Sequence, residues 1–232
     1  MTRTAILVAH GQPSDPAPAE ADVQQLAARV AAVCPDWTIR AATLASPDAL
    51  QGALEGTEAP VIFPLFMADG WFIRSALPDR LARAGATGAR ILTPFGLLPE
   101  VRTLAAKAAE GAARARDWRP QDCTLILAAH GSGRSPQPAE AAARTASAIA
   151  AMVPFAAIRT GFIEETPHLA EVAAGSGAWA ICLPLFIARW GHVIDDIPAA
   201  LARARFRGVL LDPVGTMPEV PALIARAIRG SG

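Results

Sequence analysis

Three side chains that bind metals or carry protons follow segments that the sequence predicts to be buried strands. His130 follows the apolar run at 124–129, and Glu164 and His192 follow two later apolar runs. Two imidazoles and a carboxylate suit a divalent transition metal, and the same groups accept protons near neutral pH. Because ligands bind at the carboxyl ends of parallel strands, we expect these three residues to converge as metal ligands and catalytic groups.

A fourth histidine, His10, stands in nearly the same local sequence as His130, at an offset of 120 residues (130 − 10). The similarity continues, since the segment 61–81 aligns with 180–201. The chain is therefore predicted to contain two copies of one α/β unit. His10 is either a further metal ligand or a residue kept after duplication to hold its turn, and the sequence leaves both open.

The two copies differ at the positions that carry chemistry. Phe72 aligns with His192, and Ala45 aligns with Glu164. The first copy therefore keeps only its strand-end histidine. We expect a degenerate site in the first copy and the working site in the second.

The order of elements predicts the fold class. Short apolar strands alternate with helices, which is typical of parallel sheets with right-handed crossovers. We expect an α/β chain of two tandem duplicated domains, each a parallel sheet flanked by helices, with a cleft between them. The predicted bounds are 1–116 and 123–232, with the polar segment 117–122 as linker. Three prolines after His10 are expected to delay the first helix until about Glu20.

Composition excludes several classes of function. The 232 residues are 52% hydrophobic and carry no net charge, and no basic stripe is present to attract nucleic acid or anionic lipid. No apolar run approaches the roughly 18 residues of a membrane span, so we expect a soluble cytoplasmic protein. The three cysteines form no CxxC pair, which argues against a disulfide framework, a cysteine-based zinc site or an iron–sulfur cluster. We expect them to be small core residues.

Other polar and aromatic residues surround the predicted site. Glu165 replaces Glu164 as the candidate if the strand ends one residue later. Asp195 and Asp196 open a helix, where they either interact with its positive end or orient His192. Trp190 lies in the loop just before His192. It is either a core or lid residue or part of a site for a flat ligand.

Three motifs together resemble a known family. They are AHG at 129–131, FIE at 162–164 and PLFIARWGHVIDDIP at 184–198. With them, nearly the whole chain resembles the class II tetrapyrrole chelatases, in particular the long, two-domain form of the sirohydrochlorin chelatase family often called CbiX. The resemblance implies that His130, Glu164 and His192 handle the metal.

The implied activity is that of a metal chelatase, a lyase that inserts Fe²⁺ or Co²⁺ into sirohydrochlorin for siroheme or cobalamin biosynthesis. Absence of a histidine-rich tract favours iron slightly. Metal and macrocycle are both substrates, so no bound cofactor is expected. Arg134 and Arg189 are candidates to bind the substrate carboxylates, together with Trp190. The internal duplication allows a monomer to supply both halves of a cleft.

Two other functions compete with this interpretation. The chain could be a non-catalytic carrier of metal or tetrapyrrole, which would bind tightly without turnover. A histidine phosphatase also places a histidine after its first strand, but it needs an arginine directly before that histidine. Ala9 and Ala129 occupy those places here, so the phosphate clamp is missing.

Overall fold

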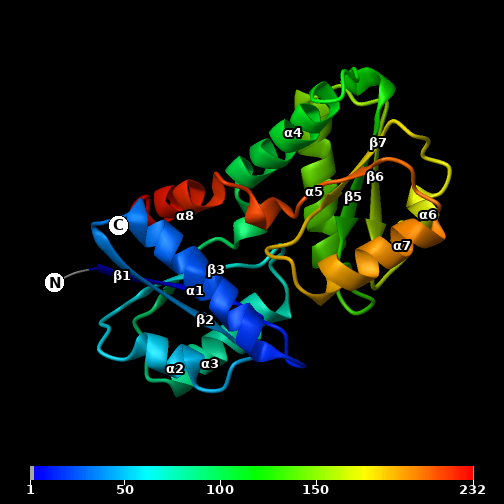
Figure 1. The fold of residues 1–232 in the computed structure, drawn as a ribbon. Coiled ribbons are helices and arrows are strands. Elements are labelled where there is room, and N and C mark those ends of the chain that lie inside the picture. Colours follow the sequence, from blue (N-terminus) through cyan, green and yellow to red (C-terminus); the bar gives the residue numbers. More distant parts are fainter. Residues whose placement is uncertain (1–2, 232) are drawn as a thin grey trace. The chain divides into compact units, whose positions relative to one another are not determined.

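The computed structural model describes residues 3–231 and divides into two compact units. Unit 1 extends to Leu97 and also contains the segment from Pro218 onward, whereas unit 2 is the continuous segment Leu98–Met217. Each unit has a four-stranded parallel sheet flanked by helices (Figure 1). This arrangement confirms the predicted fold class of two duplicated α/β domains.

Unit 1 has the strand order β2-β1-β3-β4, with all neighbours parallel. Its strands are β1 (Arg3–Ala9), β2 (Trp37–Thr43), β3 (Val61–Pro64) and β4 (Arg90–Ile91), and its helices are α1 (Pro16–Ala32), α2 (Ala49–Leu54), α3 (Leu77–Arg83) and α8 (Val220–Arg229).

Unit 2 has the equivalent strand order, β6-β5-β7-β8, again parallel throughout. Its strands are β5 (Thr124–Ala129), β6 (Ala157–Phe162), β7 (Ala180–Pro184) and β8 (Val209–Leu210), and its helices are α4 (Pro99–Arg114), α5 (Gln137–Met152), α6 (Leu169–Ala173) and α7 (Ile197–Arg203).

The central strand of each sheet is apolar because both of its faces are covered. In β5, Leu125 to Ala128 are completely buried, and in β1 the same holds from Ala5 to Ala9. In unit 2, Ile126 and Ala128 pack in one core cluster with residues of α6 and α7. A histidine follows each central strand directly, so burial of the strand fixes where that histidine emerges at the carboxyl edge.

The compact units differ from the two sequence repeats by one helix each. Helix α4 ends the first repeat in sequence but packs against α5 and β7 of unit 2, and α8 ends the second repeat but packs against α1 and β3 of unit 1. The intervening segment 117–122 lies within unit 2 and contains a 3₁₀ turn at Pro120–Asp122. The last helix of each sequence repeat therefore belongs to the compact unit that contains the sheet of the other repeat.

The first helix also begins earlier than predicted. Pro16 opens α1, and Pro18 lies in its first turn. Proline is tolerated there because the first backbone N–H groups of a helix have no partner within the helix, so these prolines do not delay the helix to Glu20. At 17 residues α1 is the longest helix between residues 3 and 231, and none of these helices has the length and apolar character to cross a membrane.

Candidate metal centre

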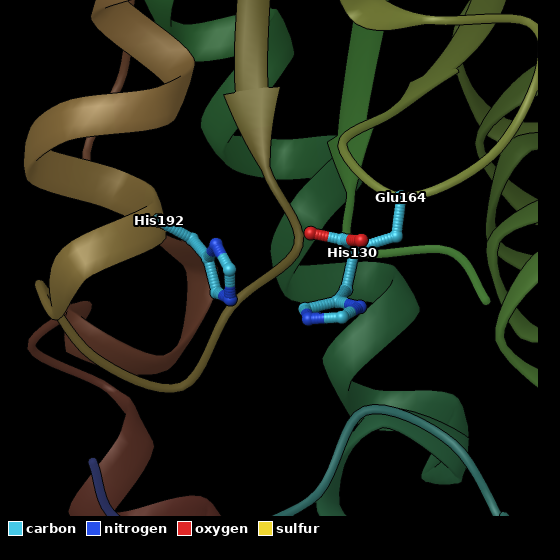
Figure 2. A group of neighbouring side chains, drawn as sticks. All are labelled: His130, Glu164 and His192. Carbon is cyan, nitrogen blue, oxygen red and sulfur yellow. The ribbon is translucent and has the colours of Figure 1, made fainter. Parts of the chain in front are cut away.

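The three residues at the predicted strand ends lie together in unit 2. One ligand atom from each of His130, Glu164 and His192 lies within 4.8 Å of the others. Figure 2 shows the three side chains around a common space. Within residues 3–231, no other set of three histidine, cysteine, aspartate or glutamate side chains meets in this way.

Backbone hydrogen bonds connect the segments that follow β5 and β6. The carbonyl oxygen of His130 accepts hydrogen bonds from the N–H of Glu164, at 2.9 Å, and of Ile163, at 3.2 Å. Gly131 then turns the chain with φ +75°, a conformation in which glycine has no steric penalty. A Cβ at this position would lie 2.8 Å from Cγ of Glu165 and 2.9 Å from Cβ of Phe162. Both the turn and the close packing beneath it therefore require glycine.

The two histidines of the centre present their rings edge to face. Their centroids are 4.6 Å apart and the ring planes are inclined by 89°. Nδ1 of His130 lies 2.8 Å from the carbonyl oxygen of Gly131. A carbonyl only accepts hydrogen bonds, so Nδ1 is the donor and Nε2 of His130 keeps a free lone pair for a metal ion.

His192 comes from a different kind of element. It begins a π-helical turn, His192–Asp196, that leads directly into α7. Such turns occur mostly inside α-helices and often at functional sites. The side chain of His192 is 42% exposed, and His130 and Glu164 are also accessible to solvent. An incoming ligand can therefore reach all three residues directly.

The donor set defines what the centre can do. Two neutral imidazole nitrogens and one carboxylate oxygen bind Fe²⁺, Co²⁺ or Zn²⁺ and leave further coordination positions open. The negative charges of Glu164 and Asp196 favour a cation there. An ion held by so few protein ligands can exchange them for other donors, and the same nitrogen and oxygen atoms can accept protons.

Unit 1 has a histidine and an aromatic ring in the same arrangement as the two histidines of unit 2, but it lacks the equivalents of Glu164 and His192. His10 follows β1, and its Nδ1 lies 2.9 Å from the Gly11 carbonyl oxygen. The centroid of its ring lies 4.3 Å from that of Phe72, and the two ring planes are inclined by 87°. This geometry closely resembles that of the histidine pair in unit 2. Phe72 and Ala45 supply no ligand atom. Among the described residues, His10 belongs to no group of three potential metal ligands.

The candidate substrate-binding residues lie on loops of the same unit. Arg134 is exposed on the loop after His130. Arg189 is also exposed and forms an ion pair with Asp212, and Trp190 is half-buried two residues before His192. A surface ion pair of this kind contributes little to stability, so Arg189 can exchange Asp212 for another carboxylate.

The structure distinguishes alternatives that the sequence left open. Glu164 belongs to the centre, whereas Glu165 packs over Gly131 and has one buried carboxylate oxygen. Asp196, rather than Asp195, contacts His192, with 2.7 Å between its Oδ2 and the ring Nδ1. The π-helical turn that creates this contact was not predicted, and no sequence signal would have indicated it.

The cysteines take no part in the centre. All three are free and buried. Burial raises the pKa of the Cys182 thiol to about 12, so this residue stays protonated in the core of unit 2. The expectation that the cysteines are small core residues is confirmed.

Comparison with known proteins identifies relatives. The model of the CbiX family matches residues 124–231, the part of the chain that contains the centre. The solved structure of CbiX described as the terminal enzyme for biosynthesis of siroheme in denitrifying bacteria is 48% identical to this chain. It covers 99% of this chain and is itself covered completely, with a TM-score of 0.92. No curated protein sequence matches.

More distant structures share the fold. SirB from Bacillus subtilis with Fe³⁺ is 17% identical, with a TM-score of 0.75 and coverage of 100% of this chain and 96% of SirB. The sirohydrochlorin chelatase SirB from Bacillus subtilis subspecies spizizenii in complex with cobalt is 18% identical, with a TM-score of 0.69 and coverage of 100% and 95%. At such identities the likeness concerns the fold alone.

Proposed function

We propose a function from the premise that this chain belongs to the CbiX family of chelatases: it inserts a divalent metal ion into sirohydrochlorin. The observation that carries the proposal is the convergence of His130, Glu164 and His192 within 4.8 Å. The relative that is 48% identical is described as the terminal enzyme of siroheme biosynthesis. Siroheme contains iron, so we propose Fe²⁺ as the metal of this chain, with Co²⁺ as the alternative.

The charge balance of the reaction explains why these residue types are needed. Insertion of M²⁺ into the macrocycle releases two protons from pyrrole nitrogens, while the metal exchanges its ligands for the four ring nitrogens. Nε2 of His130 and Nε2 of His192 hold the ion, and Glu164 completes the set. As the ion moves to the macrocycle, these atoms become free and accept the released protons.

The same loops supply groups for the rest of the substrate. Sirohydrochlorin carries several carboxylates on a flat ring. Arg134 and Arg189 are proposed to bind carboxylates, and Trp190 to contact the ring. Their position in the sequence supports this role, since Arg134 lies in the loop that follows β5 and His130, and Arg189 and Trp190 lie in the loop between β7 and His192. An Arg189→Ala variant with unchanged KM and kcat would remove Arg189 from the proposal.

The decisive experiment is an anaerobic absorbance assay with sirohydrochlorin and either Fe²⁺ or Co²⁺. Native protein is expected to accelerate insertion, faster with Fe²⁺ than with Co²⁺. His192→Ala should lower kcat by roughly 100-fold or more, the usual contribution of a proton-transfer group, in addition to weakening metal binding. His168→Ala is the matched control because His168 is exposed at the start of α6, outside the centre. Tight binding without turnover would instead indicate a carrier.

A further inference from the structure

A hydrogen bond behind the metal centre points to an additional functional residue. Asp196 Oδ2 lies 2.7 Å from Nδ1 of His192. The two residues are the first and last of the π-helical turn, so the backbone places them on one side of the same turn. Both side chains are substantially exposed, 42% for His192 and 51% for Asp196. The contact between the two side chains therefore lies at the surface of unit 2.

This contact selects one form of the imidazole. An ionised carboxylate only accepts hydrogen bonds, so Nδ1 of His192 carries the proton. Nε2 is then left with the lone pair that binds a metal ion. Carboxylates that hold a ligating histidine in this way orient the ring and raise its basicity.

The two histidines obtain the same tautomer from different partners. Nδ1 of His130 donates to the backbone carbonyl of Gly131, which belongs to the main chain. Nδ1 of His192 has a side-chain partner, Asp196, which can be replaced. The orientation of His192 can therefore be tested separately from that of His130.

The internal duplication offers a comparison. Unit 1 has an equivalent π-helical turn, Phe72–Ala76. Phe72 occupies the place of His192 and Ala76 that of Asp196, so the histidine and its carboxylate are both missing. Unit 1 therefore forms its π-helical turn without either residue.

We propose that Asp196 is a positioning residue that fixes the tautomer and ring orientation of His192 for metal binding. This inference rests on the proposed role of His192 as a metal ligand. Asp196 does not itself belong to the three ligand residues. Asp195 is also exposed and acidic but forms no hydrogen bond with His192, so the proposed effect does not rest on charge alone.

The first measurement is Co²⁺ titration of the full chain without sirohydrochlorin, followed by the visible absorption of the bound ion. Asp196→Ala should weaken Co²⁺ binding about 10- to 100-fold, the usual effect of losing such a partner. Asp196→Asn should recover part of the loss, because its amide oxygen still accepts the Nδ1 proton. Asp195→Ala removes the same charge one residue away and should bind as native.

The second measurement is the tautomer of His192 in metal-free protein, read from ring ¹⁵N chemical shifts at mildly alkaline pH. Native protein and Asp195→Ala should show His192 protonated at Nδ1, and Asp196→Ala should show a mixture of tautomers. If Asp196 had a purely structural role, the ¹⁵N chemical shifts of His192 would be the same in Asp196→Ala as in native protein. The proposal would be overturned if Asp196→Ala bound Co²⁺ with native affinity. It would also be overturned if Asp196→Ala and Asp195→Ala lost Co²⁺ affinity to the same extent.

These outcomes separate the inference from the proposed function. Native protein that binds Co²⁺ in an Asp196-dependent way but does not accelerate insertion would support the role of Asp196 while refuting chelatase activity. Native protein that binds no Co²⁺ would overturn the positioning role, since His192 would then have no metal to bind.

Discussion

Gly131→Ala is expected to damage the metal centre through the backbone, without changing any ligand. Gly131 has φ +75°, and an alanine Cβ there would meet Cγ of Glu165 at 2.8 Å and Cβ of Phe162 at 2.9 Å. Relief of these contacts must move either the strand end at Phe162 or the turn that holds His130. The turn contains the carbonyl that orients His130, so a shift there should also impair metal binding.

The magnitude follows from two costs. A left-handed backbone costs a non-glycine residue about 1–2 kcal/mol. Insertion of a methyl group into a packed site costs about 1–3 kcal/mol. Because the Glu165 side chain can yield but Cβ of Phe162 cannot do so easily, we expect a loss of about 2–4 kcal/mol in the free energy of unfolding of unit 2.

Two other glycines serve as matched controls. Gly133, in the same loop, has no positive φ, and a Cβ at this position would have no neighbour nearer than 3.9 Å, so Gly133→Ala should change stability by less than about 0.5 kcal/mol. Gly11 is the equivalent of Gly131 in unit 1, with φ +77° and Cβ of Thr43 at 2.8 Å from the position of an added Cβ. Gly11→Ala should destabilise unit 1 to a similar extent and leave Co²⁺ affinity unchanged.

Amide hydrogen exchange reads the stability of the two units separately, through the amides of β1 and β5. Co²⁺ titration gives the affinity of the centre for each variant. The reasoning is refuted if Gly133→Ala is as destabilising as Gly131→Ala. Native Co²⁺ affinity in a destabilised Gly131→Ala protein would show that the turn does not position His130.

Three further predictions concern the ligands and the core. Glu164→Gln keeps the size of the side chain but removes its charge, so Co²⁺ affinity measured by titration should fall at least about tenfold, or about 1.4 kcal/mol. Ala45→Glu combined with Phe72→His should create a second centre around His10, raising the Co²⁺ stoichiometry measured by equilibrium dialysis from one to two per chain; an unchanged stoichiometry would contradict the equivalence of the two units. Cys182 ionises near pH 9.0 when exposed but near 12 in the core, so between these values the unfolded state binds fewer protons. The free energy of unfolding, measured by urea titration, should therefore fall by up to about 1.4 kcal/mol per pH unit as pH rises, and less steeply in Cys182→Ala.

The location of the centre was predictable because it depends on strand ends. The apolar run before His130 identifies a buried central strand, and the carboxyl edge of a parallel sheet brings His130, Glu164 and His192 together whatever the details of the loops. The repeat also indicated which half contains the candidate ligands, since the side chains of Phe72 and Ala45 cannot bind a metal.

Other features depended on information that a single sequence lacks. The partner sheet of α4 and of α8 was not predictable, because the apolar face of an amphipathic helix shows that the helix is packed but not which sheet it packs against. The choice of Asp196 over Asp195 as partner of His192 depends on the rotation of a π-helical turn. The start of α1 is ambiguous in sequence because proline breaks the interior of a helix but is tolerated in its first turn, where Pro16 and Pro18 lie.

The placement of α8 also affects the order in which the protein can be completed during synthesis. Unit 2 is continuous in the chain and has all its elements once Met217 has been made. Unit 1 lacks α8, whose buried residues include Leu223, Ile224 and Ile228, until the segment after Met217 has been made. Although domains usually fold in the order of their synthesis, here the half that begins first is the last to be finished.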